Sequence, residues 1–272
     1  MTDEVLRRPF CQTVYPSRSG KNAKAALAFA RDLPAGVHVR VRQPGGSERE
    51  VVTAAAPLRQ ATATEPALPT IVLRYDGVAV LRLPTFELTA DALRSVIDTL
   101  PATLAGLVID VRGNPGGDSG LADDLASALI GARETTVMTC RSPSFPDGYR
   151  SEVRPGHTPI VVPAVRTSVL VDGLTYSAAS TFARDVALGT DALVVGLSEA
   201  GAYFSDPRTL SLAGPPAFGV KIDGSVCLGP AGAAVEGRPI SPRLHAEMAP
   251  ADVARGVDTQ LEAAVRALLA GT

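Results

Sequence analysis

The chain is short of aromatic residues and of clustered positive charge. Only 4% of its 272 residues are aromatic, tryptophan is absent, and the formal net charge is −2. Proteins that bind nucleic acids carry a basic patch or stripe on one face. Because this sequence has no basic cluster and few aromatic residues, we expect no nucleic-acid partner.

Long apolar runs are missing as well. The longest runs, such as PIVVP at 159–163 and GLVID at 106–110, are far shorter than the roughly 20 residues that cross a bilayer. The N-terminal stretch MTDEVLRRPF has no apolar segment of signal-peptide length. We therefore expect a cytoplasmic protein without a membrane partner.

Cysteine is scarce, and its three copies, Cys11, Cys140 and Cys227, lie far apart in the sequence. Their spacing matches neither a disulfide framework nor a zinc motif. We expect three buried, reduced thiols. We also expect no metal and no other cofactor.

Hydrophobic residues make up 46% of the chain, which is enough for one large core with or without a small appendage. Residues 22–33 have the apolar spacing of a short helix. Valines alternate with polar residues over 37–42, a PGG turn follows, and the apolar pattern returns at 51–52, which predicts a hairpin. The Pro-, Ala- and Thr-rich residues 57–70 are typical of a linker. We place an N-terminal segment at 1–64 and a larger domain at 65–272.

Within residues 65–272, apolar runs alternate with amphipathic stretches. Asp76-Gly77 predicts a tight turn between two strands, and Thr89 is expected to cap the next helix. We interpret 132–162 as a mixed segment with a loop around 142–148, and 218–229 as a late strand pair. Strands that alternate with helices in this way indicate an α/β layered fold. The predicted strands are 70–75, 77–86, 105–111, 166–172 and 191–196, and the predicted helices are 89–100, 118–131, a helix beginning at Ser177, and 258–271.

Two turns stand out, VIDVRGNPGGDSG at 108–120 and VLVDGLTYSAAS at 169–180. Each follows a buried strand and opens a helix, and ligands of α/β sheets bind at the carboxyl ends of the strands. The N-terminus of a helix offers free N–H groups that favour negative charge. Gly116 and Gly117 let the backbone approach a substrate closely.

Together the two turns resemble those of the C-terminal processing, or tail-specific, serine peptidases, which include tricorn-core-like relatives. Four segments carry the resemblance: GVAVLRLPTF, GLVIDVRGNPGG, VLVDGLTYSAAS with ALVVG, and EGRPISP with GVDTQLEAAV. It covers roughly residues 70–272 and implies a layered fold like that of ClpP and the crotonases. The hairpin at 37–52 is similar to part of the PDZ-like module of these peptidases, so 1–64 is expected to be a partial PDZ-like segment.

The resemblance also implies roles for individual residues. Ser177 would be the nucleophile, Ala178 would give one backbone N–H to the oxyanion, and Gly116 or Gly117 would give the other. Glu236 matches an acidic residue of the tricorn-like branch.

Both bases of the family are replaced in this chain. The lysine of the tail-specific branch corresponds to Ala202, which takes no proton. The histidine of the tricorn-like branch corresponds to Arg82, which stays protonated and suits a carboxylate or phosphate instead. Three other groups are candidates for the base: His157, His245 and Lys221.

Three functions follow from these observations. The first is a hydrolase that transfers the acyl group of a peptide, or of a small amide or ester, through Ser177 with a non-standard base. The second is a non-catalytic relative that binds a peptide or another ligand. The third is an enzyme that uses only the oxyanion hole, assisted by Arg82, Tyr176 or Tyr203. The expected partner is a peptide or small-molecule substrate, and a homo-oligomer stays open.

Overall fold

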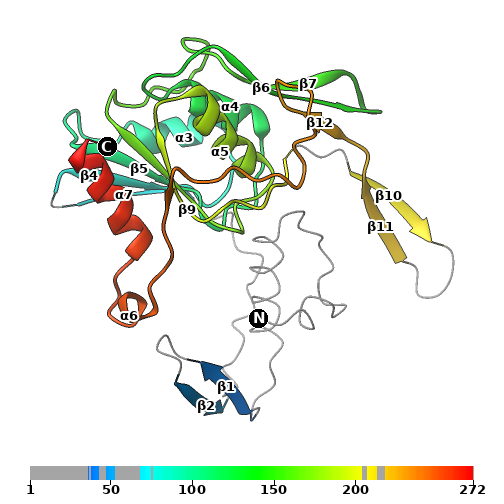
Figure 1. The fold of residues 1–272 in the computed structure, drawn as a ribbon. Helices are drawn as coiled ribbons and strands as arrows, with labels where there is room; N and C mark the ends of the chain where they lie inside the picture. Colours follow the sequence, from blue (N-terminus) through cyan, green and yellow to red (C-terminus); the bar gives the residue numbers. More distant parts are fainter. Residues whose placement is uncertain are drawn as a thin grey trace.

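A six-stranded sheet forms the centre of the protein, and helices cover both of its faces (Figure 1). The computed structural model describes residue 36 and residues 38–42, 47–52, 68–74, 76–203, 207–212 and 218–271. The strand order is β13-β9-β8-β5-β4-β3, with β3 antiparallel to its neighbour and the other pairs parallel. The strands are β3 Thr70–Leu73, β4 Val78–Arg82, β5 Gly106–Asp110, β8 Thr167–Val171, β9 Leu193–Gly196 and β13 Leu244–His245.

The strands follow one another across the sheet in chain order, so the turns after neighbouring strands meet at one edge. The turn at Gly77, whose φ is 79°, joins β3 to β4 as predicted. β5 and β8 lie side by side in parallel, with Leu107 paired to Thr167, and all residues of both strands are buried. The two turns singled out in the sequence therefore leave the same edge of the sheet from adjacent strands.

Side chains cap the first turns of two helices, at Thr89 as predicted and at Asp118, for which no cap was predicted. Thr89 accepts a hydrogen bond from the Ala92 N–H, and Asp118 accepts one from the Leu121 N–H at 2.8 Å. A predicted helical end at Gly131 is wrong, because the helix after Asp118 already ends at Ser127 and a turn continues to Gly131. The helices are α3 Ala90–Ile97, α4 Ser119–Ser127, α5 Ala178–Gly189, α6 Pro250–Val253 and α7 Thr259–Ala270.

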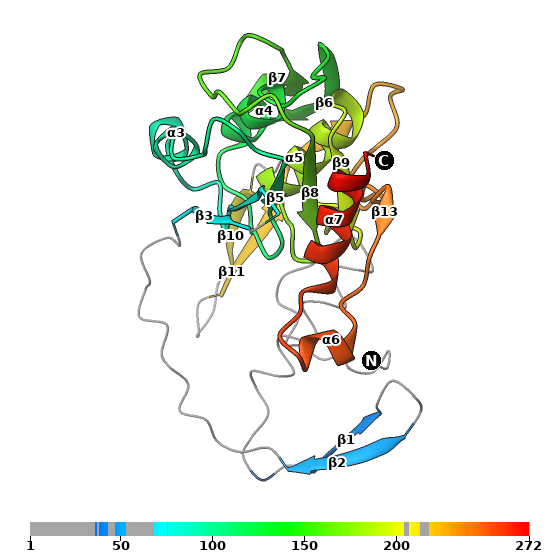
Figure 2. The same cartoon turned by 90° about the vertical axis from the view of Figure 1, so that its left-hand side faces the viewer.

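Alternation along the strands divides the core into two layers. On β4, Ala79 and Leu81 pack with the residues of α3, α4 and α5, whereas Val78 and Val80 pack with those of α7. Figure 2 shows α7 along one side of the sheet and α3 and α4 on the other. Side chains of successive residues in a strand point to opposite faces, so each strand supplies both layers. The α/β layered fold is confirmed.

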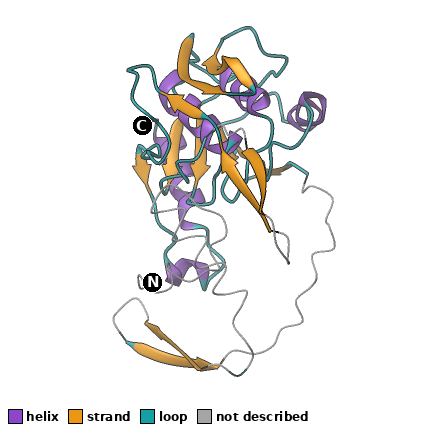
Figure 3. Ribbon diagram, turned by 90° about the vertical axis from the view of Figure 1, so that its right-hand side faces the viewer, coloured by secondary structure: helices purple, strands orange, loops and turns teal. Residues whose placement is uncertain are grey.

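A second, three-stranded sheet lies beyond α4 and α5, with the order β12-β6-β7 (Figure 3). It consists of β6 Thr135–Ser142, β7 Phe145–Val153 and β12 Val226–Leu228. The predicted loop at 142–148 is therefore wrong, because β7 begins inside it. The segment 218–229 contains two strands, but they do not pair with each other: β11 Phe218–Asp223 pairs with β10 Pro207–Leu212, and β12 pairs with β6.

The expectation of three reduced thiols is wrong for two of them. Cys140 and Cys227 are directly opposite each other on β6 and β12, and they form a disulfide with an S–S distance of 2.04 Å. The partners are 87 residues apart in sequence, and only the pairing of β12 with β6 brings them together. Sequence spacing alone therefore gave no signal for this bond.

The N-terminal hairpin has the predicted pairing. β1 His38–Arg42 is antiparallel to β2 Glu48–Val52, with His38 opposite Val52. The predicted helix at 22–33, the linker at 57–70 as far as residue 67, and the boundary at 64/65 lie outside the described residues. Across the part of the chain that is described, none of the helices has the length and apolar character to span a membrane.

Candidate active site

The turn after β5 and the turn before α5 touch each other. A Cβ atom at Gly116 would lie 2.6 Å from the Ser177 Cβ and 2.9 Å from the Ala178 nitrogen, closer than real Cβ atoms approach. Gly116 has a φ of 102°, so both the space and the backbone conformation favour glycine here. The predicted meeting of the two turns is what brings Ser177 and Gly116 into contact.

Hydrogen bonds hold this corner together. The Asn114 side chain is buried, donates to the Leu83 carbonyl at 2.8 Å and accepts the Gly116 N–H at 2.8 Å. The Tyr176 N–H donates to the Asn114 carbonyl at 2.9 Å, and the Thr175 hydroxyl donates to the Val111 carbonyl at 3.0 Å. The Asn114 side-chain bonds hold the first turn to the end of β4, and the Tyr176 and Thr175 bonds run between the two turns, so the position of one turn fixes that of the other.

Ser177 has a strained backbone. Its φ of 55° and ψ of −125° make it the one non-glycine residue with positive φ among those described. Such a conformation costs about 1–3 kcal/mol and persists where the surroundings impose it. A serine on a sharp, strained turn between a strand and a helix is also the geometry of a nucleophile elbow. The Ser177 N–H donates to the Ala202 carbonyl at 2.9 Å.

The Ser177 side chain does not serve as a helix cap. Its hydroxyl makes no capping hydrogen bond, and within the described residues no other hydrogen bond to it is found. The residue is half-buried. The hydroxyl therefore remains available to a ligand.

Two backbone N–H groups beside Ser177 are also available. Among the described residues, neither the Ala178 N–H at the start of α5 nor the Gly117 N–H has a hydrogen-bond partner. Phe86 pairs with the backbone on one side of Gly117, donating to the Gly116 carbonyl at 2.7 Å and accepting the Asp118 N–H at 3.0 Å. In such a bridge, the N–H of the middle residue points away from its partner strand, so the Gly117 N–H points away from Phe86. The Gly116 N–H is already bonded to Asn114, so Gly117 is the better candidate of the two predicted donors.

Both positions at which the family has a base can be located. Ala202 lies beside Ser177, because its carbonyl accepts the Ser177 N–H, and it is almost fully buried. Arg82 is the exposed last residue of β4 and alternates with Val78 and Val80, which pack with α7. Since α5 lies on the other layer, the strand directs Arg82 to the face opposite the helix that Ser177 precedes.

The other proposed bases lie elsewhere. His157 is exposed in a turn and lines a cavity beside α4. His245 is exposed on β13, where its ring is 3.4 Å from the Glu247 carboxylate. Lys221 lies opposite Thr209 on the β10–β11 hairpin, and its side chain lies outside the described part. Neither histidine has a hydrogen bond to the Ser177 turn.

Two glutamates support the segment that carries Ala202. Glu199 is fully buried and accepts hydrogen bonds from the Gly201 N–H, the Ile240 N–H and the Tyr203 hydroxyl. Burial raises the pKa of Glu199, and these hydrogen bonds together with one from Ser180 oppose the shift. Sequence reasoning missed Glu199, although an acidic residue three positions before Ala202 was a signal that could have pointed to it.

Glu236 is the second of these glutamates. Its carboxylate accepts the Tyr203 N–H at 3.3 Å. Desolvation raises its pKa, the N–H bond of Tyr203 opposes this, and the charges of Asp223 and Glu199 add to it. Ser177 and Glu236 therefore flank the same peptide unit, with the Ala202 carbonyl bonded to one and the Tyr203 N–H bonded to the other.

A family model described as peptidase family S41 matches residues 77–246. No curated protein sequence matches the chain. Mature CPAF complexed with lactacystin has a TM-score of 0.63 at 15% identity, over 91% of this chain and 72% of that one. A putative peptidase from Parabacteroides merdae ATCC 43184 has a TM-score of 0.60 at 20% identity, over 76% of this chain and 66% of that one. A putative S41 protease from Bacteroides fragilis NCTC 9343 has a TM-score of 0.54 at 15% identity, over 86% of this chain and 66% of that one. At these identities the similarity is one of fold.

Proposed function

Since the chain belongs to peptidase family S41, we propose that it is a serine hydrolase that cleaves a peptide, or a small amide or ester, through Ser177. The observation that carries this proposal is the strained backbone of Ser177 at the start of α5, with Gly116 packed against it. The strained conformation of this half-buried serine does not serve helix capping. A catalytic role for its side chain therefore explains the conformation best.

The chemistry follows from the groups around that serine. The Ser177 oxygen attacks the carbonyl carbon of the substrate, its proton leaves to a base, and negative charge develops on the carbonyl oxygen. Backbone N–H groups from Ala178 and Gly117 would donate to that oxygen. Preorganised donors of this kind contribute about 10²- to 10³-fold each to the rate.

The family pattern identifies no base in this chain, because Ala202 and Arg82 occupy the two base positions. Glu236 and Ser177 bond to the two sides of the Ala202–Tyr203 peptide unit, and one Glu236 carboxylate oxygen has no hydrogen bond among the described residues. The C=O and N–H of a trans peptide point in opposite directions, and no direct hydrogen bond joins the Ser177 hydroxyl to Glu236 among the described residues, so we propose that a proton passes between them through water. We assign Glu236 this relayed role, and its raised pKa suits a base better than that of an ordinary glutamate.

A second function is favoured by a specific observation. Ala202 stands where a lysine base would, and the Ser177 hydroxyl is not bonded to any described base. A relative that binds a peptide or stabilises an anion without covalent attack would show the same features. Arg82 points to the opposite layer, so it supports neither hydrolysis through Ser177 nor binding without covalent attack.

Labelling with a fluorophosphonate, followed by mass mapping of the modified peptide, distinguishes the two functions. Hydrolysis through Ser177 predicts one adduct on Ser177, loss of that adduct in Ser177→Ala, and no change in Ser95→Ala, a control at an exposed serine of α3. Lactacystin, bound in one of the CPAF structures, is a second probe. Absence of any adduct under conditions that keep the protein folded contradicts the hydrolase and leaves the binding function.

A further inference from the structure

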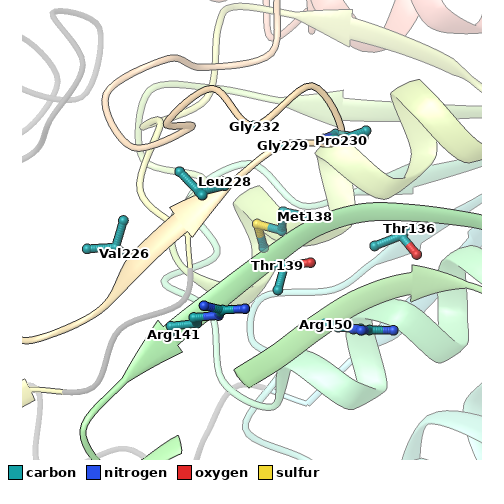
Figure 4. Close-up of a pocket in the computed structure, with 10 residues that line it drawn as sticks. All are labelled: Thr136, Met138, Thr139, Arg141, Arg150, Val226, Leu228, Gly229, Pro230 and Gly232. Carbon is teal, nitrogen blue, oxygen red and sulfur yellow. The ribbon is translucent and has the colours of Figure 1, made fainter. Parts of the chain in front are cut away.

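The outer face of the three-stranded sheet carries a groove of about 640 Å³ (Figure 4). We call it the β6 groove. Its volume lies within the range of about 300–1,000 Å³ typical of ligand sites. Its lining comes from all three strands and from the loop after β12: Thr136, Met138, Thr139, Arg141, Arg150, Val226, Leu228, Gly229, Pro230 and Gly232.

The pairing of the strands places apolar side chains and guanidinium groups in separate columns of this groove. One row across the sheet holds Leu228, Thr139 and Arg150, and the next row on the same face holds Val226 and Arg141. Apolar side chains thus follow β12, and guanidinium groups follow β6 and β7. The opposite face of the same strands is buried against the Cys140–Cys227 disulfide and Tyr203. The groove therefore lies on the exposed face of a sheet that the disulfide cross-links.

The apolar column is unusually exposed. Val226 is 60% exposed and Leu228 is 40% exposed. Apolar side chains grouped on the surface beside polar ones mark sites of interaction. No segment of the described chain covers them.

The positive charge of the groove lacks internal compensation. Arg141 has no ion pair or hydrogen bond among the residues that are described, and Arg150 is 4.0 Å from the Glu152 carboxylate. That carboxylate is also in contact with Arg154, so one negative charge serves two arginines. The groove is therefore complementary to carboxylates.

We propose that the β6 groove binds an extended peptide segment of another polypeptide, in which apolar side chains are flanked by carboxylates. In an extended chain, side chains on the same side repeat every two residues, about 6.6 Å apart. Val226 and Leu228 are also two residues apart on a strand, as are Thr139 and Arg141, so the periods match. The apolar side chains lie along β12, and the carboxylates reach the guanidinium groups, which bind them in bidentate geometry.

This binding does not depend on the reaction of Ser177, and the test keeps the two apart. The probe is a fluorescein-labelled peptide, Ala-Asp-Ala-Leu-Ala-Val-Ala-Asp-Ala, which places both Asp residues, Leu and Val on one face of the extended chain and is blocked at both ends so that neither terminus contributes charge. Its matched control has both Asp residues replaced by Asn. Fluorescence anisotropy gives the Kd for the full chain, for Ser177→Ala, and for the double variant Arg141→Gln with Arg150→Gln.

We expect equal Kd values for the wild type and Ser177→Ala, and a Kd about tenfold higher for the double variant, the loss of roughly one charge-assisted hydrogen bond. The Asn peptide should bind the wild type as weakly as the Asp peptide binds the double variant. Both arginines are exposed, so the double variant should keep the wild-type melting temperature. A separate variant, Val226→Asp, should weaken the Asp peptide through repulsion.

Three results would overturn the proposal. They are the same Kd for the Asp and Asn peptides, no difference between the wild type and the double arginine variant, and loss of binding in Ser177→Ala alone. The last would place the peptide at Ser177 instead. Because labelling of Ser177 by the fluorophosphonate is measured separately, a failure of the β6 groove and a failure of the hydrolase are distinguishable.

Discussion

The site has two parts, backbone groups that would hold an oxyanion and a side chain that would act as the base. The backbone groups are in place, whereas both base positions of the family hold residues that cannot take a proton. On the backbone side, Gly116 packs against Ser177, and the N–H groups of Ala178 and Gly117 have no partner among the described residues. On the side-chain side, an alanine stands at position 202 and an arginine at position 82. We call Gly116 and the N–H groups of Ala178 and Gly117 the backbone cradle. Because the cradle depends on glycines and on strand pairing, it is retained when a single ionisable side chain is replaced.

The comparison predicts the largest effect for a change to the cradle itself. In Gly116→Ala, the new Cβ would lie 2.6 Å from the Ser177 Cβ and would displace the serine. A misplacement of about 1 Å costs roughly 100-fold in rate, so we expect labelling of Ser177 to slow by at least about 100-fold. Gly113→Ala is the matched control, because Gly113 has a φ of 73° but no atom within 4 Å of its Cβ position. Equal loss in both variants would show that only the backbone strain matters.

Restoring the family's base sharpens the other side of the comparison. Ala202→Lys places an amine beside the Ser177 turn, and general bases typically contribute about 10²- to 10⁴-fold. We expect labelling at pH 8 to rise about 10- to 100-fold, since burial at this position lowers the pKa of a lysine towards neutrality. Ala202→Met, similar in length but without a proton acceptor, should show no gain. If Met and Lys act alike, position 202 does not reach the hydroxyl.

The relayed role of Glu236 predicts a smaller effect that depends on pH. A base acts when ionised, and desolvation raises the pKa of Glu236. The rate of Ser177 labelling should therefore rise with pH through a pKa above that of an ordinary glutamate, and then level off. Glu236→Gln should remove this limb and lower the plateau about tenfold. An unchanged pH profile in this variant would remove Glu236 from the mechanism.

The smallest effect concerns α5 away from the cradle. Asp185 is fully buried on this helix, next to Asp123 of α4, and the Ser151 hydroxyl contacts both carboxyl groups. Burial raises the pKa of Asp123 to about 6 and raises that of Asp185 as well. Because the folded state favours the protonated forms, this pair stabilises the protein fully below about pH 4 and loses that contribution as the pH rises through 6.

Asp185→Asn keeps a hydrogen-bonding side chain without the proton equilibrium. We expect it to raise the free energy of unfolding at pH 8 by about 1–2 kcal/mol and to flatten the pH dependence between 5 and 8. Chemical denaturation at several pH values measures both, with Asp98→Asn at an exposed end of α3 as the control. Labelling of Ser177 should stay within about threefold of wild type. A large change in labelling would mean that the cradle depends on the helix as a whole.

Most predictions about the sheet and its helices rested on patterns of neighbouring residues, and most of these were confirmed. The cap at Thr89, the turn at Gly77 and the buried runs of β5 and β8 each rest on neighbouring residues. The segments that were misread depend on distant ones. The first residues of β7, up to Gly148, were taken for a loop because the pairing of β7 with β6 and its packing on α4 decide its structure. The Cys140–Cys227 bond exists only because β12 returns to β6.

The site divides in the same way. The contact of Ser177 with Gly116 follows from two turns on adjacent parallel strands, which the motifs indicated. Glu199 supports the Ala202 segment from a buried loop and was missed, because a lone acidic residue in a glycine-rich turn has many uses. The cytoplasmic location, the homo-oligomer and the PDZ-like nature of residues 1–64 stay predictions.

The most direct measurement is a crystal structure of the protein after reaction with a fluorophosphonate. We predict a phosphonyl group bonded to the Ser177 oxygen, with its free oxygen about 2.7–3.1 Å from the nitrogens of both Ala178 and Gly117. A phosphonyl oxygen directed into solvent, or bonded to side chains instead of these two amides, would contradict the account.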